Sequence, residues 1–258
     1  MTGTPVVRTE VDGHVGRITL SRPEQLNAIT VQLGTELEAA LRGLGADPEV
    51  NVIAIRGAGG SFCAGGDFHE VERLRADGPA GLSPLFEHFA AACRAIAEIP
   101  VPVVAVVEGA AAAGGFELMQ AADIVLVHDE ARIADNHIRF GQVPGGGSTQ
   151  RLPRLVGRQQ ALGLLLSGDR ISGAEAHRLG LAYRSWPDAA FDTEVEAFLG
   201  TLAGRRRDAA VGIKHLVYAG LESDLGTGLG LELDAVVAHI SGDAGGAGVT
   251  AFAARSPA

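Results

Sequence analysis

Two short glycine-rich segments, each placed after an apolar strand-like run, are the most informative feature of the sequence. The run Asn51–Arg56 leads to Ala64-Gly65-Gly66, and the run Val103–Val107 leads to Ala113-Gly114-Gly115. Glycine lets a ligand approach the backbone closely, and amides at a helix N-terminus are unpaired and partly positive. Two such loops side by side can direct two N–H groups at one oxygen, as a reaction through an enolate or a tetrahedral oxyanion requires. The matched copies favour this interpretation over one in which the glycines serve only tight turns.

One acidic residue stands close to the second loop. Glu117 follows Gly114 by three residues in an apolar surround, so a helix that begins near Gly114 carries both on one face. A carboxylate in such surroundings is costly unless it is hydrogen bonded or functional, and burial raises its pKa toward the range of a general base. The alternative for Glu117 is a helix-capping or ion-pair role. We therefore predict an oxyanion hole with a base beside it.

Other catalytic templates are absent from the sequence. Gly57-Ala58-Gly59 follows a strand, but the third glycine of a dinucleotide fingerprint falls at Phe62. The pair His69-Glu70 has no second histidine at Arg73, so the zinc-protease pattern is missing. Lys214 is the only lysine and no glycine precedes it, which excludes a phosphate-binding P-loop. These absences remove the commonest dehydrogenase and hydrolase interpretations.

The composition limits the partners and the compartment. The 258 residues carry a formal net charge of −10, which argues against nucleic acid or an acidic membrane surface as the main partner. Cys63 and Cys93 are too few for a disulfide framework or a zinc site, and Met1–Asp12 lacks a signal-peptide pattern. The apolar stretch Ile99–Val127 is interrupted by prolines and acidic residues, which favours a buried strand and helix over a membrane span. A reduced, cytoplasmic protein without a bound metal is expected.

Strand-like and helical patterns alternate along most of the chain. The pair Ser83-Pro84 predicts the start of a helix that ends before Pro100. After about residue 188 the strand signal disappears, so we predict an α/β body over 1–188 and a helical region over 189–258. Such a region is too thin for a core of its own and docks on the body or on another subunit. The predicted strands are Val6–Val11, His14–Leu20, Asn51–Arg56, Val103–Val107 and Ile124–Val127.

Several segments, taken together and in their order along the chain, resemble segments of the crotonase (enoyl-CoA hydratase/isomerase) family. The resemblance covers nearly the whole chain. The resemblance implies a repeated ββα spiral and a C-terminal helical region used in trimer contacts, often in a dimer of trimers. It also implies a lyase of fatty acid or other lipid metabolism, acting on acyl-CoA thioesters with no cofactor beyond the coenzyme A of the substrate. The matching segments are Ile18–Ala28, Phe62–Asp67, Gly109–Leu118, Pro144–Pro153 and Ser167–Leu181.

The same resemblance implies roles for individual residues. Gly66 and Gly114 match the family's oxyanion donors, and Glu117 matches the first of its two catalytic glutamates. A group of apolar residues can line an acyl pocket or serve equally as helix core: Leu82, Leu85, Phe86 and Phe89. The residues expected near coenzyme A are Ala64, Asp67, Phe68 and His69, with Phe252 and Arg255 on a final helix that often reaches across a subunit boundary. Plain helix packing is the alternative for Phe252.

The second catalytic glutamate of the family is missing. Aligning the run Ala131–Gly141 places His137 at that position. A histidine can supply a proton near neutral pH, can activate water against a carbonyl, or can be structural. The leading hypothesis is therefore an enoyl-CoA hydratase that adds water to a 2-enoyl-CoA thioester. The alternatives are an acyl-CoA double-bond isomerase, a C–C or thioester hydrolase that uses His137, and a non-catalytic acyl-CoA-binding subunit.

Overall fold

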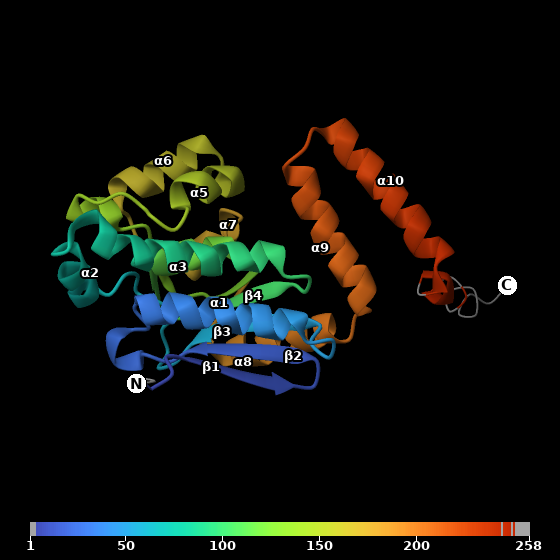
Figure 1. Ribbon diagram of the computed structural model, residues 1–258, viewed down its shortest axis with the longest axis horizontal. Helices are drawn as coiled ribbons and strands as arrows, with labels where there is room; N and C mark the ends of the chain where they lie inside the picture. The colour runs from blue at the N-terminus through green and yellow to red at the C-terminus, as the bar shows by residue number, and fades with distance from the viewer. Residues whose placement is uncertain (1–3, 244, 249, 251–258) are drawn as a thin grey trace. The chain divides into compact units, whose positions relative to one another are not determined.

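The chain divides into two units, Met1–Gly204 and Arg205–Ala258. The computed structural model describes residues 4–243, 245–248 and 250 (Figure 1). All strands of the described chain belong to the first unit.

A six-stranded sheet in the order β1-β2-β3-β4-β6-β9 runs through the first unit. β1 and β2 are antiparallel, and every other neighbouring pair is parallel. The sequence of β4 is apolar at every position and all of it is buried, as expected for a parallel strand covered on both faces. The strands span Val7–Asp12, Val15–Leu20, Val52–Gly57, Val103–Val107, Ile124–His128 and Arg184–Trp186, in that order along the chain.

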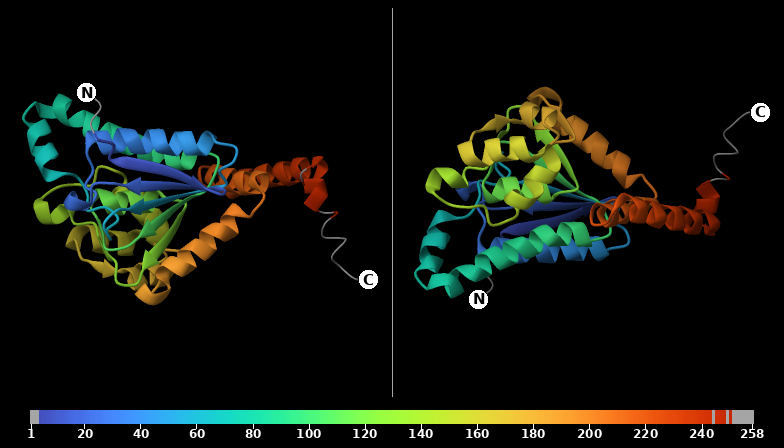
Figure 2. Two further views of the ribbon diagram at one scale, coloured as in Figure 1. Left: turned by 90° about the horizontal axis from the view of Figure 1, so that it is seen from below. Right: turned by 90° about the horizontal axis from the view of Figure 1, so that it is seen from above.

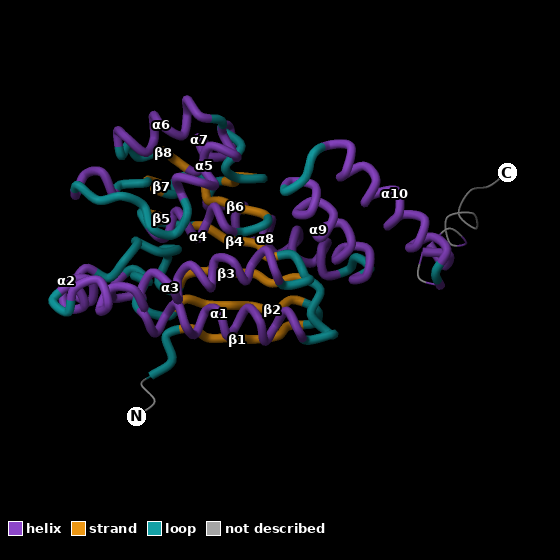
Figure 3. Tube along the Cα trace, turned by 45° about the horizontal axis from the view of Figure 1, so that its top comes forward, coloured by secondary structure: helices purple, strands orange, loops and turns teal. Residues whose placement is uncertain are grey.

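A second, small sheet holds β5 (Ala110–Ala112), β7 (Arg132–Ala134) and β8 (Ile171–Ser172) (Figure 3). β5 and β7 are parallel, and Cys63, which lies just beyond β3, bridges in parallel to Ala111 of β5. The chain therefore alternates between the two sheets: β3 then Cys63, β4 then β5, β6 then β7. This is the ββα spiral that the family resemblance implies. Because these neighbours are parallel, the segments that follow them leave the small sheet at one edge.

Helices cover both faces of the six-stranded sheet (Figure 2). On one face α1 packs against β2 and β3 and against α3, while α8 covers the other face. Phe191, Val195 and Leu199 of α8 are buried against strand residues that include Val104 and Leu126. The helices of this unit are η1 (Pro23–Gln25), α1 (Val31–Ala46), α2 (Phe68–Arg75), α3 (Gly78–Glu98), α4 (Gly114–Ala121), η2 (His137–Phe140), α5 (Ser148–Val156), α6 (Arg158–Ser167), α7 (Gly173–Arg178) and α8 (Asp188–Ala203).

Two boundaries differ from those expected from the sequence. The division between the units falls after Gly204 instead of residue 188, because the apolar side of α8 belongs to the core of the first unit. Helix α3 begins at Gly78 and contains Pro84, whereas the sequence predicts its start at Ser83. Pro79 occupies the first turn instead, and an interior proline costs about 3 kcal/mol. Burial of Leu85 and further apolar residues along α3 offsets that cost.

The described part of the second unit contains α9 (Arg207–Leu221) and α10 (Leu225–Ser241), which contact each other. Asp224 caps the start of α10 by accepting a hydrogen bond from the backbone N–H of Thr227. Many apolar side chains of these helices are exposed in the isolated chain: Ile213, Val217, Leu221, Leu225, Leu229, Leu231, Leu233, Val236, Val237 and Ile240.

Within the described residues, no helix combines the length and the apolar character needed to cross a membrane. The apolar stretch Ile99–Val127 instead forms β4, β5, the short helix α4 and most of β6. Every residue of α4 is buried. The sequence-based choice of buried strand and helix is therefore confirmed for this stretch.

Candidate active site

A cavity of about 660 Å³ opens where the loops after the small sheet meet α3 and α4. Its lining includes Gly66, Gly114, Glu117 and His137, so the four residues that the sequence singled out for catalysis surround one space. They come from successive turns of the spiral, after Cys63, after β5 and after β7. Ligand sites at the carboxyl ends of parallel strands are common in α/β proteins.

The two glycine loops lie side by side. A Cβ atom added to Gly65 would lie 2.8 Å from the Cβ of Ala113 and 3.4 Å from the backbone nitrogen of Gly114. The N–H groups of Gly66 and Gly114 donate no hydrogen bond to another described residue. Both residues line the cavity, and Gly114 is the first residue of α4, where the backbone N–H has no partner within the helix. The geometry therefore fits an oxyanion hole.

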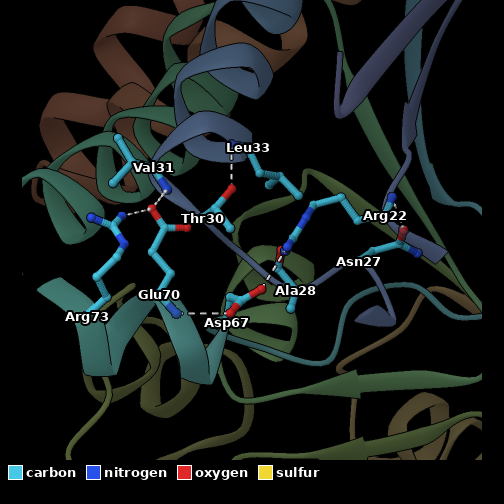
Figure 4. Close-up of polar contacts among 9 residues, drawn as sticks. All are labelled: Arg22, Asn27, Ala28, Thr30, Val31, Leu33, Asp67, Glu70 and Arg73. Atoms are coloured by element: carbon cyan, nitrogen blue, oxygen red, sulfur yellow. Dashed lines mark hydrogen bonds and ion pairs between the residues drawn. The ribbon is translucent and has the colours of Figure 1, made fainter. Parts of the chain in front are cut away.

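The first loop is fixed by a polar network (Figure 4). The Asp67 carboxylate lies 2.7 Å from the Arg22 guanidinium and caps α2 by accepting from the Glu70 N–H at 3.1 Å. The same guanidinium donates to the carbonyl oxygen of Ala28. Burial alone would raise the pKa of Asp67, but the Arg22 and backbone hydrogen bonds outweigh it and hold that pKa below its usual range. A charged Asp67 thus ties Gly66 to the N-terminal segment.

The second loop carries backbone strain. Ala113 has φ 47° and ψ −119°, a conformation that favours glycine. Its N–H is held by the carbonyl oxygen of Ala134 at the end of β7, and its own carbonyl accepts from Glu117. Strained non-glycine residues persist where the surrounding structure determines them, and they cluster at functional sites. Here the strain sets the direction of the next amide, that of Gly114.

Glu117 is almost fully buried, with 2% of its surface exposed. Its Oε1 atom accepts hydrogen bonds from the backbone N–H groups of Gly146 at 2.7 Å and Ser148 at 3.0 Å. Burial raises the pKa of the Glu117 carboxyl. The hydrogen bonds from Ser148 and Gly146 and the charge of His137 lower it, but the effect of burial is larger, so the pKa is raised overall. One oxygen is therefore held in place, while Oε2 is free to act on a ligand.

His137 faces Glu117 across the cavity, with 3.9 Å between its Nε2 atom and Oε2 of Glu117. Its Nδ1 atom lies 2.7 Å from Oδ1 of Asp135, whose side chain is 1% exposed. Burial alone would lower the pKa of His137, but the hydrogen bond and charge of Asp135 and the charge of Glu117 raise it overall. A pair of proton-carrying groups thus stands beside the oxyanion hole.

The residues expected to contact coenzyme A fall into separate places. Ala64 and Phe68 line the main cavity, together with the apolar group Leu82, Leu85, Phe86 and Phe89. Asp67 and His69 line a neighbouring hollow of about 410 Å³ with Arg22 and Arg73. Phe252 and Arg255 lie outside the described residues.

Several residues of the site were missed by sequence reasoning. Gly146 and Ser148 lie 29 and 31 positions from Glu117, and their amides act through a fold-dependent contact. Arg22 lies 45 positions from Asp67. Asp135 had a local signal, since an Asp-x-His spacing brings a carboxylate within reach of the imidazole. That spacing became informative once His137 was aligned with a catalytic position.

Comparison with known proteins gives one consistent result. A sequence model of the enoyl-CoA hydratase/isomerase family matches residues 10–258. The chain is 34% identical over 223 residues to a probable enoyl-CoA hydratase of Mycobacterium bovis, covering 86% of this chain and 85% of that one. It is 33% identical over 244 residues to the mitochondrial enoyl-CoA hydratase of Pongo abelii, covering 95% and 82%. A crystal structure of an enoyl-CoA hydratase from Polaromonas sp. JS666 matches with a TM-score of 0.92 and 31% identity, covering 96% and 97%.

Proposed function

This chain belongs to the enoyl-CoA hydratase/isomerase family, and from that premise we propose how its cavity works. Its function is that of an enoyl-CoA hydratase-like lyase, which adds water to the double bond of a 2-enoyl-CoA thioester. One observation carries the mechanism proposed here. Glu117 has one oxygen held by two amides and the other turned toward His137 across the space that a thioester would enter.

The thioester carbonyl oxygen is held between the N–H groups of Gly66 and Gly114. As water attacks C3, negative charge moves to this oxygen and an enolate forms, so both donors bind the transition state more tightly than the substrate. Losing one such donor typically costs on the order of 3 kcal/mol in barrier height. The absence of internal partners for both amides supports this assignment.

Glu117 and His137 supply the proton steps. Oε2 of Glu117 takes a proton from water while the water oxygen bonds to C3, and the C2=C3 π electrons move toward the thioester. Nε2 of His137 then gives a proton to C2, so that one water has been added in total. Glu117 is left protonated and His137 neutral; transfer between them, over the 3.9 Å gap, restores the starting state. No resident cofactor is required.

The acyl group that fits this cavity is apolar. Leu82, Leu85 and Phe86 line it together with Ile29 and Phe89, and the acidic side chain among the lining residues is the proposed base Glu117. The lining also includes Arg75, which could pair with a carboxylate, so the preference for an uncharged acyl chain rests on the apolar walls of the cavity. We therefore assign unsubstituted or aromatic 2-enoyl groups as the substrate class.

Addition of 2-enoyl-CoA thioesters of increasing chain length tests the proposal. We expect the absorbance of the conjugated thioester to fall and the product mass to rise by one water. A product of unchanged mass would identify the isomerase alternative. If the folded protein converts no substrate of any chain length, only the alternative of a non-catalytic acyl-CoA-binding subunit remains.

Hydrolysis is the second candidate, and the Asp135–His137 hydrogen bond favours it. An imidazole held by a carboxylate is an arrangement that activates water against a carbonyl. In that case a free acid and, for a thioester, free coenzyme A thiol would accumulate in place of a hydroxyacyl thioester. Mass analysis of the same reaction mixtures separates the two candidates.

We further propose a homotrimer, or a dimer of trimers, working in the cytoplasm. The exposed apolar residues of α9 and α10 are consistent with burial against another subunit. Both cysteines are free and buried, as suits a reducing compartment. In this assembly Ala64, Asp67, Phe68 and His69, with Phe252 and Arg255, contact coenzyme A. Light scattering of the purified protein gives the subunit number.

A further inference from the structure

Asp135 is a buried charge with a single charged partner among the described residues. Its Oδ1 atom lies 2.7 Å from Nδ1 of His137, and none of the described lysine and arginine residues pairs with it. The other oxygen, Oδ2, is buried and has no hydrogen-bond partner within the described chain. A buried carboxylate is costly unless it is paired. The imidazolium form of His137 therefore provides the compensation that the rest of the site lacks.

The contact also fixes which ring nitrogen faces the cavity. Because Nδ1 lies against the Asp135 carboxylate, it carries a proton, and Nε2 is directed toward Oε2 of Glu117 at 3.9 Å. The exposed fraction of the His137 side chain is 13%, so the ring has little freedom to exchange this carboxylate for water. The position, ring orientation and charge of His137 thus depend on one neighbour, Asp135.

We propose that Asp135 is a positioning residue that holds His137 as an imidazolium with Nε2 toward the substrate α-carbon. The second proton donor of this site is then a cation sustained by a buried carboxylate, instead of a neutral carboxylic acid. This inference rests on the proposed hydration mechanism, in which His137 protonates C2.

The charges around His137 support this assignment. Asp135 precedes it on the segment after β7, and Glu117 faces it from α4, where it is the only titratable residue. In η2 the nearby Arg139 pairs with Asp169 at 3.9 Å, and the charged residue of α6, which packs against η2, is Arg158. Two carboxylates therefore share one imidazole. With both carboxylates ionised, protonated His137 leaves one net negative charge, so a base and an acid coexist.

The alternative is that Asp135 has a structural role only, in which its contact with His137 stabilises the loop between β7 and η2. In that case loss of the Asp135 contact would lower the stability of the protein and would change substrate binding and turnover together. A positioning role predicts a different pattern, because the acid acts only in the transition state. Turnover then falls while substrate binding stays nearly constant.

The test uses the whole protein with the D135N and D135E substitutions, and D12N as a matched control on an exposed aspartate at the end of β1. For D135N we expect kcat to fall about 10–100-fold with KM changed less than about threefold. The alkaline limb of the kcat profile should move to lower pH, and D135E should restore part of the rate. D12N should behave as the wild type. An unchanged kcat and unchanged pH profile in folded D135N would overturn the proposal.

A second measurement is independent of turnover. Nitrogen-15 NMR of the imidazoles, with His137 assigned from the spectrum of an H137Q variant, reports the protonation state and the protonated ring nitrogen. We expect His137 to stay protonated to higher pH in the wild type than in D135N. Equal titration in both proteins would refute the role of Asp135 even if hydration is observed. If the wild type does not hydrate any enoyl-CoA but the NMR difference is present, the mechanism fails and the positioning contact stands.

Discussion

Nε2 of His137 and Oε2 of Glu117 lie 3.9 Å apart in a cavity that both residues line. Groups this close titrate as a pair, and each changes the proton affinity of the other. The buried Glu117 sits next to a cation that favours its ionised form, and His137 sits between two carboxylates.

The rate of hydration should have a bell-shaped dependence on pH. Glu117 must be ionised to accept a proton, so the rate falls as pH drops through its pKa, which burial raises above that of an ordinary glutamate. His137 must be protonated to donate, so the rate also falls as pH rises through its pKa, which Asp135 raises. Measuring kcat/KM from acid to alkaline pH checks both limbs. An activity that persists unchanged into strongly alkaline solution would contradict the role of His137.

The E117Q substitution should remove the base without disturbing the fold. The amide oxygen of glutamine can still accept from Gly146 and Ser148, whereas no proton can be taken from water. We expect kcat to fall by about 10²–10⁴-fold with little change in KM. E130Q, at an exposed residue, is the matched control. Retained turnover in E117Q would assign the base to another group.

Gly146 should not tolerate a side chain. A Cβ atom there would lie 2.9 Å from Oε2 of Glu117 and would also collide with the ring of Phe89. G146A is expected to displace the base and to lower kcat at least tenfold, since a misplacement of about 1 Å can cost about 10²-fold. In G163A the added methyl meets nothing within 4 Å, so that variant should keep full activity. Steady-state kinetics and thermal unfolding of both variants separate a local effect from loss of the fold.

The strain at Ala113 predicts that A113G stabilises the protein. Holding alanine at φ 47° costs about 1–3 kcal/mol, and glycine removes that cost while losing about 0.4–1 kcal/mol through the unfolded state. The free energy of unfolding should therefore rise by about 1 kcal/mol. A112G, one residue earlier in β5, should be destabilising instead. Urea denaturation of the two variants measures the free energy of unfolding. An equal loss of that free energy in both variants would contradict backbone strain at Ala113.

Much of the fold and part of the site follow from local sequence patterns. The strands could be predicted because continuous β-branched runs such as β4 are typical of strands buried on both faces. Glu117 could be placed near Gly114 because a spacing of three residues is fixed by helix geometry. Each of these signals lies within a few residues of the feature it predicts, and so needs no knowledge of the tertiary structure.

The remainder depends on contacts between distant segments. The amides of Gly146 and Ser148 define which oxygen of Glu117 is free, and nothing in residues near 117 indicates them. Helix α3 extends through Pro84 because its neighbours bury its apolar side, which overrides the local proline signal. The end of the first unit depends likewise on where α8 packs.

The spiral gives each winding of the chain its own share of the chemistry. In the proposed mechanism, the windings that end at Gly66 and Gly114 activate the thioester carbonyl, while the winding that ends at Asp135 and His137 holds the second proton carrier. These segments leave the small sheet at one edge and are joined through separate loops, but the carbonyl oxygen of Ala134 at the end of β7 also holds the N–H of Ala113, so changes that leave the second glycine loop in place must begin after Ala134. Redesign of the β7–η2 loop is thus a route to new outcomes from the same activated thioester.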